Sequence, residues 1–457
     1  MRSRARCAPC GERGRPAAHG CARKTPTRKA PAMSLRRTVA ALVASAALCA
    51  AATPAAVAEE SPSAQAPAQR DLPSALYGKG DPRYDGVWRQ SLALLAQDTA
   101  GVKPAGKAVE WLTGQQCEDG AFASYRPDPT EPCTAETVAD VNATAVAVQA
   151  LAALGGHDER VEKAVEWLKL VRNEDGGWGY NPGAPSDANT VSLVIGALVA
   201  AGQDPAKALS DEGGSPYDAL LDFRLGCDAK ADERGAFAYQ PDDKGRLAAN
   251  DDATAAAVLA ALGEDLVVEP GDQNGAAAKA PTCDGDGDEE PTPAEAAAGG
   301  AAYLARTLEE GGGHLTSALP GAEEQPDYGN TADAVLALAA AGREDAARAS
   351  LAWLEENAPT WEGFEDNPAA LGQLVLAARA TGGDPSDFGG TDLVELLNAT
   401  GPAPASVPDD GGNADDGEGG AEKGGDGLPV IGIAAGAVLV VAVVAAVVVL
   451  RGRRRSE

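Results

Sequence analysis

A repeat with a period of 56 residues constrains the fold of this chain more than any other feature of its sequence. The segment KAVEWLTGQQCEDGAF, which begins at Lys107, recurs as KAVEWLKLVRNEDGGW at Lys163. Trp111, Trp167 and Phe223 stand 56 residues apart, and weaker copies follow in GAAYLARTLEE and RASLAWLEEN. A fixed period of this length predicts that copies of one helical unit pack side by side.

Each repeat contains two kinds of helical pattern. One mixes apolar and charged residues, as in VEKAVEWLKLV, and is typical of a helix with one exposed face. The other is apolar on all sides and mostly ends in Gly, as in ATAVAVQALAALGG and TVSLVIGALVAAGQ, and predicts a helix buried on both sides. Counting GVWRQSLALLAQ from Gly86 and TDLVELLN from Thr391, the chain holds six of each kind. We therefore predict an all-α fold, an α/α toroid with six inner and six outer helices.

The loop from an outer to an inner helix repeats as well. DGGWGYNPGAPSDANT, Asp175 to Thr190, has weaker copies that share a Gly, an aromatic residue, a Tyr-x-Pro and an Asn near a Thr. Gly120, Gly176 and Gly235 allow a tight exit from the outer helix, and Phe122, Trp178 and Phe237 are expected to fill the space between neighbouring helical hairpins. The loop is thus expected to be mainly structural.

The same loops also predict a candidate site. Asn142, Asn189, Asn250 and Asn330 are expected to be helix N-caps. Because all the loops converge on one end of the barrel, their polar and aromatic side chains form a candidate ligand-binding rim there. Its members are Tyr125, Asp140, Asn142, Trp178, Tyr180, Asp187, Asn189, Tyr239, Asp251, Asp252, Asp327, Tyr328 and Asn330.

The two ends of the chain predict export and membrane anchoring. Residues 1–58 contain basic residues, an apolar run and a small-x-small site at 56–58, typical of a secretory signal whose true start is Met33. Residues 428–450 are an uncharged apolar run long enough to span a bilayer, and the basic tail 451–457 places the C-terminus in the cytoplasm. We expect a single-pass protein of the cell membrane with most of the chain outside. The sequence LPVIG only partly resembles a sortase signal because Ile431 replaces the Thr, which favours a plain anchor.

The exported part divides into three segments of different composition. Residues 59–85 are expected to be a disordered leader, residues 86–398 the toroid with an insertion at 264–292, and residues 399–427 a disordered acidic stalk. Residues 59–450 hold 66 acidic and 23 basic residues, a net charge near −43. Such a surface repels phosphate backbones, so we expect no nucleic-acid partner.

Four cysteines remain in the exported part: Cys117, Cys133, Cys227 and Cys283. An even number in an exported domain predicts two disulfides. Three pairings are possible, and the local pairs Cys117–Cys133 and Cys227–Cys283 are favoured because each closes one excursion between helices.

The segment WLTGQQCEDGAF resembles the QW-type repeat of squalene and oxidosqualene cyclases, whose repeats join the outer helices of an α/α toroid. The resemblance covers roughly residues 86–398, and the second copy has Arg172 where Gln is expected. Protein prenyltransferase β-subunits, thioester-containing domains and the α-domains of cobalamin carriers share this fold. The resemblance therefore implies the fold, and function depends on the site.

The residues that these relatives use for catalysis are incomplete. Class II cyclases protonate an alkene with the middle Asp of an Asp-x-Asp-Asp-Thr-Ala motif, but DVNATA places Asn142 there. NDDATA keeps Asp252 but has Ala253 next, which leaves Asp252 as the single weak catalytic candidate. The inner helices also lack the aromatic residues that stabilise carbocations. Prenyltransferases need Asp, Cys and His on zinc, whereas the exported part holds only His157 and His314 and four cysteines expected to be oxidised. A thioester domain needs Cys-x-Glu-Gln, which QQCEDG lacks.

A second cation motif lies in the insertion. DGDGDEEPTPAE places Asp284, Asp286, Asp288 and Glu295 at the first, third, fifth and twelfth positions of an EF-hand loop. Glu289 replaces the Gly that the sixth position needs, and two prolines interrupt the loop, which favours a solvated acidic segment over calcium.

Three functions follow from these observations. The favoured one is a monomeric surface binding protein without a cofactor. It resembles the cobalamin-carrier α-domain and captures a small molecule, for example a corrinoid, or docks a companion surface protein or transporter. The second is a terpenoid-modifying enzyme with Asp252 as the acid, and the third is a structural surface protein with no ligand.

Overall fold

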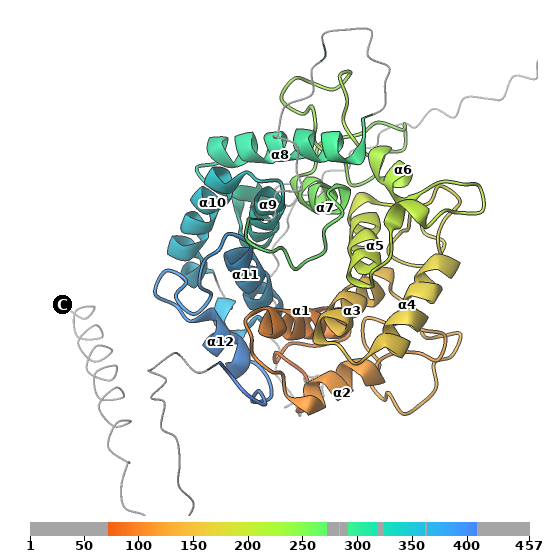
Figure 1. Cartoon of the computed structure of the whole chain (residues 1–457), viewed down its shortest axis with the longest axis vertical. Coiled ribbons are helices and arrows are strands. Elements are labelled where there is room, and N and C mark those ends of the chain that lie inside the picture. The colour runs from red at the N-terminus through yellow and green to blue at the C-terminus, as the bar shows by residue number, and fades with distance from the viewer. Residues whose placement is uncertain (1–71, 272–282, 284–290, 318–323, 362, 409–457) are drawn as a thin grey trace, which may run out of the picture. The chain divides into compact units, whose positions relative to one another are not determined.

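Six helices form a closed inner ring in the computed structural model, which describes residues 72–271, 283, 291–317, 324–361 and 363–408. These inner helices are α1 (Gly86–Thr99), α3 (Val141–Leu154), α5 (Ala188–Ala200), α7 (Asp251–Ala261), α9 (Tyr328–Ala340) and α11 (Pro368–Ala380). Each packs against the next along the chain, and α11 packs against α1, which closes the ring (Figure 1). The predicted inner ring is confirmed.

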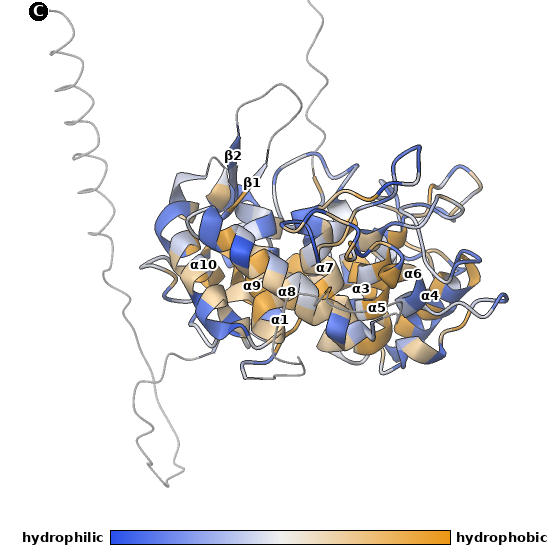
Figure 2. Cartoon of the chain, turned by 90° about the horizontal axis from the view of Figure 1, so that it is seen from above, coloured by the Kyte–Doolittle hydropathy of each residue, from blue (hydrophilic) through white to orange (hydrophobic). Residues whose placement is uncertain are grey.

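Six outer helices surround this ring, each paired with the inner helix that precedes it. They are α2 (Gly106–Gly114), α4 (Asp158–Leu170), α6 (Pro216–Leu221), α8 (Pro293–Glu310), α10 (Glu344–Asn357) and α12 (Leu393–Ala399). Short 3-10 turns occupy Pro205–Lys207, Ala358–Thr360 and Phe364–Asp366. Figure 2 shows hydrophobic residues along the inner helices α3, α5 and α7, and more hydrophilic residues on the outer helices and the loops. This matches the two helical patterns of the sequence.

A small antiparallel sheet departs from the all-α prediction. β1 (Leu315–Ser317) pairs with β2 (Gln325–Asp327), with Thr316 opposite Pro326. The strands occupy the place of the aromatic-Gly loop in the fourth repeat, where the backbone N–H of Leu315 donates to Thr331 Oγ1 at 3.0 Å. No alternating run marks these strands in the sequence because each has only three residues.

The repeated loop braces the ring as predicted. Phe122, Phe237 and Trp178 are at most 1% exposed, and the indole N–H of Trp178 donates to the Leu168 carbonyl at 2.7 Å. Gly120 has φ +102°, and a Cβ there would lie 2.2 Å from the carbonyl oxygen of Lys163. Glycine is thus required where the loop meets the backbone of the next outer helix.

Backbone hydrogen bonds connect each loop to two inner helices. The N–H of Asp140 donates to the Phe122 carbonyl at 2.9 Å, and the N–H of Val141 donates to the Tyr180 carbonyl of the next repeat at 3.0 Å. The same pair of bonds recurs at α5, from Asp187 to Trp178 and from Ala188 to Tyr239. The repeated loops therefore fix where the inner helices begin.

Both predicted boundaries of the toroid need correction. Tyr77, placed in the leader, is fully buried, and its hydroxyl donates to Gln97 Oε1 at 2.8 Å. Its ring lies so close to Gly401 that a Cβ there would be 2.2 Å from the ring. Residues 399–408, placed in the stalk, continue along the toroid, and the N–H of Lys103 donates to the Ser406 carbonyl at 2.9 Å. One aromatic residue in a polar, Pro-rich stretch was too weak a signal for this packing.

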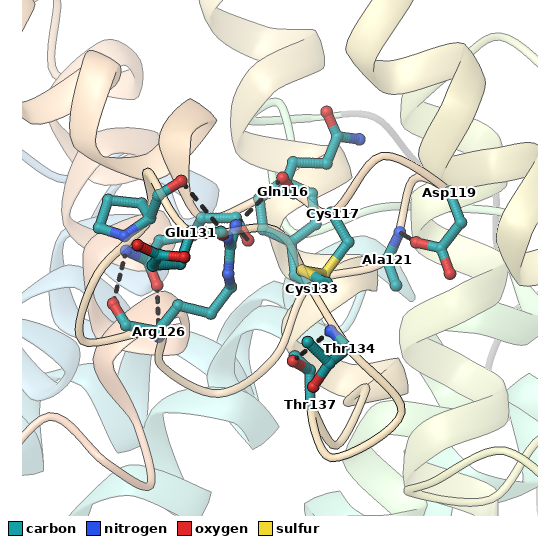
Figure 3. The surroundings of a disulfide bond; sticks show 12 residues. Gln116, Cys117, Asp119, Ala121, Arg126, Glu131, Cys133, Thr134 and Thr137 are labelled. Atoms are coloured by element: carbon teal, nitrogen blue, oxygen red, sulfur yellow. Dashed lines mark hydrogen bonds between the residues drawn. A yellow bond between two sulfur atoms is a disulfide. The ribbon is translucent and has the colours of Figure 1, made fainter.

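Both favoured disulfides are present. Cys117 bonds to Cys133 and Cys227 to Cys283, each with a Cα–Cα distance of 5.6 Å. Figure 3 shows that the first disulfide closes a loop around Arg126. The Arg126 guanidinium is buried and donates to several backbone carbonyls, including those of Gln115 and Glu131.

Several predicted segments lie outside the described residues, namely the signal region 1–58, the membrane run 428–450 and the tail 451–457. Among the helices that the structure describes, none combines the length and hydropathy needed to cross a bilayer. Export and anchoring therefore remain predictions.

Candidate functional site

A cavity of about 300 Å³ lies at the axis of the ring, and every inner helix contributes to its wall. Its body is apolar, with Leu side chains from five of the six helices and one aromatic residue, Trp88 of α1. Its polar lining residues are Asn142, Asn189, Asp252, Asn330, Asp333 and Gln373. An apolar body with a few convergent polar groups is typical of a small-molecule site.

The polar lining comes from the first two turns of the inner helices. The N-caps are Asp140, Asp187, Asn250 and Asp327, whose side chains accept the backbone N–H three residues later. Of the four predicted Asn N-caps, only Asn250 is correct. Asn142, Asn189 and Asn330 follow an Asp that takes the cap, because a carboxylate accepts these N–H groups equally well. Their amides are thereby free to line the cavity.

Two carboxyl groups with raised pKa values, Asp252 and Asp333, line the cavity. Burial raises the pKa of Asp252, and the neighbouring Asp327 raises it further, against a hydrogen bond from Asn189 Nδ2 at 2.5 Å. Burial raises the pKa of Asp333 to about 7, with further increases from Asp252 and Asp327. Gln373 Nε2 partly opposes this shift by donating to both Asp333 oxygens at 3.1 and 3.2 Å. Near neutral pH the pair therefore holds a proton for part of the time.

Amide N–H groups of the lining donate to carboxylates, whereas two of the amide oxygens accept no hydrogen bond. Asn189, Asn330 and Gln373 each direct an N–H at a carboxylate, the last two at Asp327 and Asp333. The Oδ1 atoms of Asn142 and Asn189 are buried and have no hydrogen-bond partner among the described residues. Buried acceptors of this kind are rare in folded proteins and call for an explanation.

The insertion closes one end of the cavity, which the sequence did not indicate. Residues 264–271 follow α7 and cross the ring, where they form the loop seen near its centre in Figure 1. Leu266 lines the cavity, and its N–H donates to Gln149 Oε1 at 3.0 Å. Val268 is buried against Leu259 and Leu336. We call residues 264–271 the plug.

A second depression of about 430 Å³ adjoins the cavity at the opposite end of the helices, since Asn330 and Gln373 line both. Asp327, Tyr328 and Trp361 form part of its wall. The Tyr328 and Trp361 rings stack with centroids 5.1 Å apart. The depression therefore connects the polar end of the cavity with the rim.

The structure divides the predicted rim residues into those that line the cavity, those that line the adjoining depression and those that line neither. Asn142, Asn189, Asp252 and Asn330 line the cavity, and Asp327 and Tyr328 line the adjoining depression. The others do not line the cavity: Asp140 and Asp187 cap helices, Trp178 is buried in its loop, Asp251 accepts from Tyr303, Tyr125 stacks with Trp111, and Tyr180 and Tyr239 are 43% and 45% exposed.

Four further residues line the cavity and were not predicted from the sequence: Asp333, Gln373, Trp88 and Leu266. Alignment on the N-caps reveals the first two, because Asp333 and Gln373 both stand six residues after their caps, Asp327 and Asn367. They lie one turn deeper than the predicted asparagines. The motif in which class II cyclases carry their acid covers only the first turn of a helix, so it does not reach these two positions.

The calcium motif receives no support from the described residues. Asp284, Asp286 and Asp288 lie outside them, and Glu295 accepts the Thr292 N–H at 2.9 Å in the capping box of α8. Among the residues that the structure describes, no cluster of three or more His, Cys, Asp or Glu side chains could hold a metal ion.

With this geometry established, the comparisons support the fold class. Residues 89–215, from within α1 to just before α6, match the model of the prenyltransferase alpha-alpha toroid domain. No curated protein matches the chain. The family match and the closed ring of paired helices agree on an α/α toroid.

Solved structures with similarity to the chain include several enzymes. A type II terpene cyclase from Scytonema in complex with geranylgeranyl dihydroxybenzoate is 17% identical, with a TM-score of 0.40, over 68% of this chain and 80% of that one. A sugar epimerase from a ruminal bacterium is 14% identical, with a TM-score of 0.42, over 68% and 93%. A protein from Actinoplanes is 15% identical, with a TM-score of 0.41, over 68% and 95%. Likeness at this level carries no argument about activity.

Proposed function

We propose that this protein is an exported, membrane-tethered binding protein that holds one small ligand in the axial cavity of its toroid. The observation that carries the proposal is the cavity itself, with apolar walls, one polar end and a plug at the other. Its volume of about 300 Å³ falls at the lower end of the range of small-molecule sites. A ligand with an apolar body and one polar group fits this arrangement.

The volume of the cavity limits which of the ligands suggested by the resemblance to cobalamin carriers can bind there. A corrinoid macrocycle is much larger than a cavity of about 300 Å³, so the cavity does not suit it. Export and tethering rest on the signal pattern of residues 1–58, the acidic stalk and the apolar run 428–450. The protein would thus present its ligand outside the cell, to a transporter or a companion surface protein.

Calorimetric titration of the full-length protein with 1-octanol, a minimal apolar probe with one hydroxyl, tests the proposal. We expect saturable binding at one site. Ala256→Phe, which fills the cavity, should abolish binding, whereas Ala352→Phe on the exposed face of α10 should leave it unchanged. Equal binding by both variants would place the ligand elsewhere and refute the proposal.

A second candidate function is proton transfer to an apolar substrate. It is favoured by the raised pKa of Asp333, about 7, because a protonated carboxyl in an apolar cavity is a competent general acid. Burial would then keep Asp333 protonated, and Asp252, the candidate from the sequence, would add to this effect. Turnover of polyprenyl substrates that falls as pH rises through 7, and that is lost in Asp333→Asn, would establish this function. Its absence leaves the binding function.

A further inference from the structure

We infer that the cavity selects an organic cation, a small protonated amine with an apolar body. This inference rests on the proposed binding function and specifies the ligand class. It follows from the balance of hydrogen-bond donors and acceptors at the polar end of the cavity, from the charges around it, and from the position of Trp88.

Three of the four amide side chains at the polar end donate to carboxyl groups of the protein itself. The N–H groups of Asn189 and Gln373 are directed at Asp252 and Asp333, so they are occupied within the protein. The Oδ1 atoms of Asn142 and Asn189 remain buried without a partner. The acceptors that line the cavity for a ligand are the carboxyl groups of Asp252 and Asp333, and a ligand that brings N–H donors matches them.

The charges at this end have one sign. Asp252 and Asp333 both feel the negative charge of Asp327, and Asp333 also feels that of Asp252. The described lining residues of the cavity include no Lys, Arg or His. The neighbour on α11 is the uncharged Gln373, and Arg379 of the same helix lines a different pocket beside the plug. An ammonium group would supply the missing positive charge.

The apolar part of the wall suits the rest of such a ligand. Leu193, Leu259 and Leu336 can pack against an aliphatic body, and Trp88 offers the ring type with the strongest attraction for a cation. A metal ion fits less well, because the described residues provide no cluster of three or more metal-binding side chains. Two carboxyl groups beside apolar walls are better suited to an organic ammonium.

Three eight-carbon probes test this inference by calorimetry on the full-length protein: octylammonium, 1-octanol and octanoate. At pH 8 we expect octylammonium to bind at least tenfold more tightly than either of the others. Its advantage should shrink at pH 6, where Asp333 keeps its proton. At pH 6.5 its binding should release protons to the buffer, and the binding of 1-octanol should not.

The double variant Asp252→Asn/Asp333→Asn should weaken octylammonium binding at least tenfold and change 1-octanol binding less than threefold. The control Asp243→Asn/Asp345→Asn removes two exposed charges from the acidic surface and should alter neither affinity. If 1-octanol binds as tightly as octylammonium, or the double variant keeps the preference, the inference is wrong and the binding function stands. If none of the probes binds, both are overturned.

Discussion

The two ends of the helical ring are closed in different ways. At the N-terminal ends of the inner helices, repeated loops supply an N-cap and paired backbone hydrogen bonds to one helix after another. At the C-terminal ends, the single plug, residues 264–271, crosses the ring and is attached through Gln149 and a few apolar contacts. The helices are the same at both ends, so the difference comes from the segments that connect them.

This comparison explains where a binding site can arise. The repeated loops satisfy the backbone of the first helical turns, which leaves the side chains of those turns available for a ligand. The plug instead places Leu266 in the cavity wall and buries Val268 against Leu259 and Leu336 at the opposite end. A structural repeat and a unique segment therefore cooperate to give the cavity one polar and one apolar end.

Replacing Trp178 by Ala should produce the largest effect and test the bracing of the polar end. Trp178 is 1% exposed, and its indole N–H bonds to the Leu168 carbonyl. We expect a loss of about 3–5 kcal/mol in the free energy of unfolding, since both packing and a buried hydrogen bond disappear. Chemical denaturation measures this directly.

Leu266→Ala provides the matched test at the plugged end. Because Leu266 is only partly buried and faces the cavity, its loss should cost less, about 1–3 kcal/mol. If Leu266→Ala destabilises the protein more than Trp178→Ala does, the plug contributes more to the free energy of unfolding than the loops do. The repeated loops are then not the main brace of the ring.

Asp333→Asn should give the next largest effect, and its sign depends on pH. A carboxyl whose pKa is raised to about 7 in the folded state binds a proton that the unfolded chain releases near pH 4. Its contribution to stability is therefore present at pH 4 and is lost as pH rises to 7. At pH 8 the variant should be more stable than the native protein, by at most about 4 kcal/mol. At pH 4 the two should be nearly equal.

Asp242→Asn is the control for this experiment. Hydrogen bonds from Arg246 lower the pKa of the exposed Asp242 to about 2, so Asp242 is charged throughout this range. Its replacement should shift stability equally at pH 4 and pH 8. A stability difference between native protein and Asp333→Asn that does not change with pH would show that Asp333 is not a buried acid.

The sequence predicts the residues at the polar end of the cavity better than those at the plugged end, because the loops at the polar end are repeated and the plug is not. The 56-residue repeat and the two helical patterns identify the six inner and six outer helices of the described toroid, because burial on one or two faces leaves a periodic signal. The repeated loops likewise reveal Asn142, Asn189 and Asp252. The plug occurs once, so no periodicity marks it, and its short apolar run LVV is indistinguishable from any loop segment.

Burial and mutual influence of side chains cannot be read from spacing alone. Asp333 lies in TADAVLA, where an Asp in a helix could equally face solvent. Its raised pKa depends on burial first and then on Asp252 and Asp327, and the packing of α9 against α7 brings Asp252 near it. Tyr77 shows the same limit, because its partners Gln97 and Gly401 are distant along the chain.

Gln149→Met should have the smallest effect on stability, and it tests how the plug is attached. Gln149 is 2% exposed, accepts from the Leu266 N–H and donates to the Leu193 carbonyl at 3.2 Å. Met keeps the volume and removes both hydrogen bonds. The plug can then swing into solvent, so the free energy of unfolding should fall by only about 1 kcal/mol. Hydrogen exchange at the Leu266 amide should nevertheless accelerate about fivefold.

Gln116→Met is the counterpart at a loop. Gln116 Nε2 donates to the carbonyls of Gly120 and Arg160, at 3.1 and 2.9 Å, within a loop that the Cys117–Cys133 disulfide also closes. Here the loss of hydrogen bonds should leave exchange at the Leu266 amide unchanged. If both variants accelerate that exchange equally, the plug does not open independently, and the ring must loosen as one cooperative unit. Ligand entry would then depend on the stability of the whole toroid and not on its one unique segment.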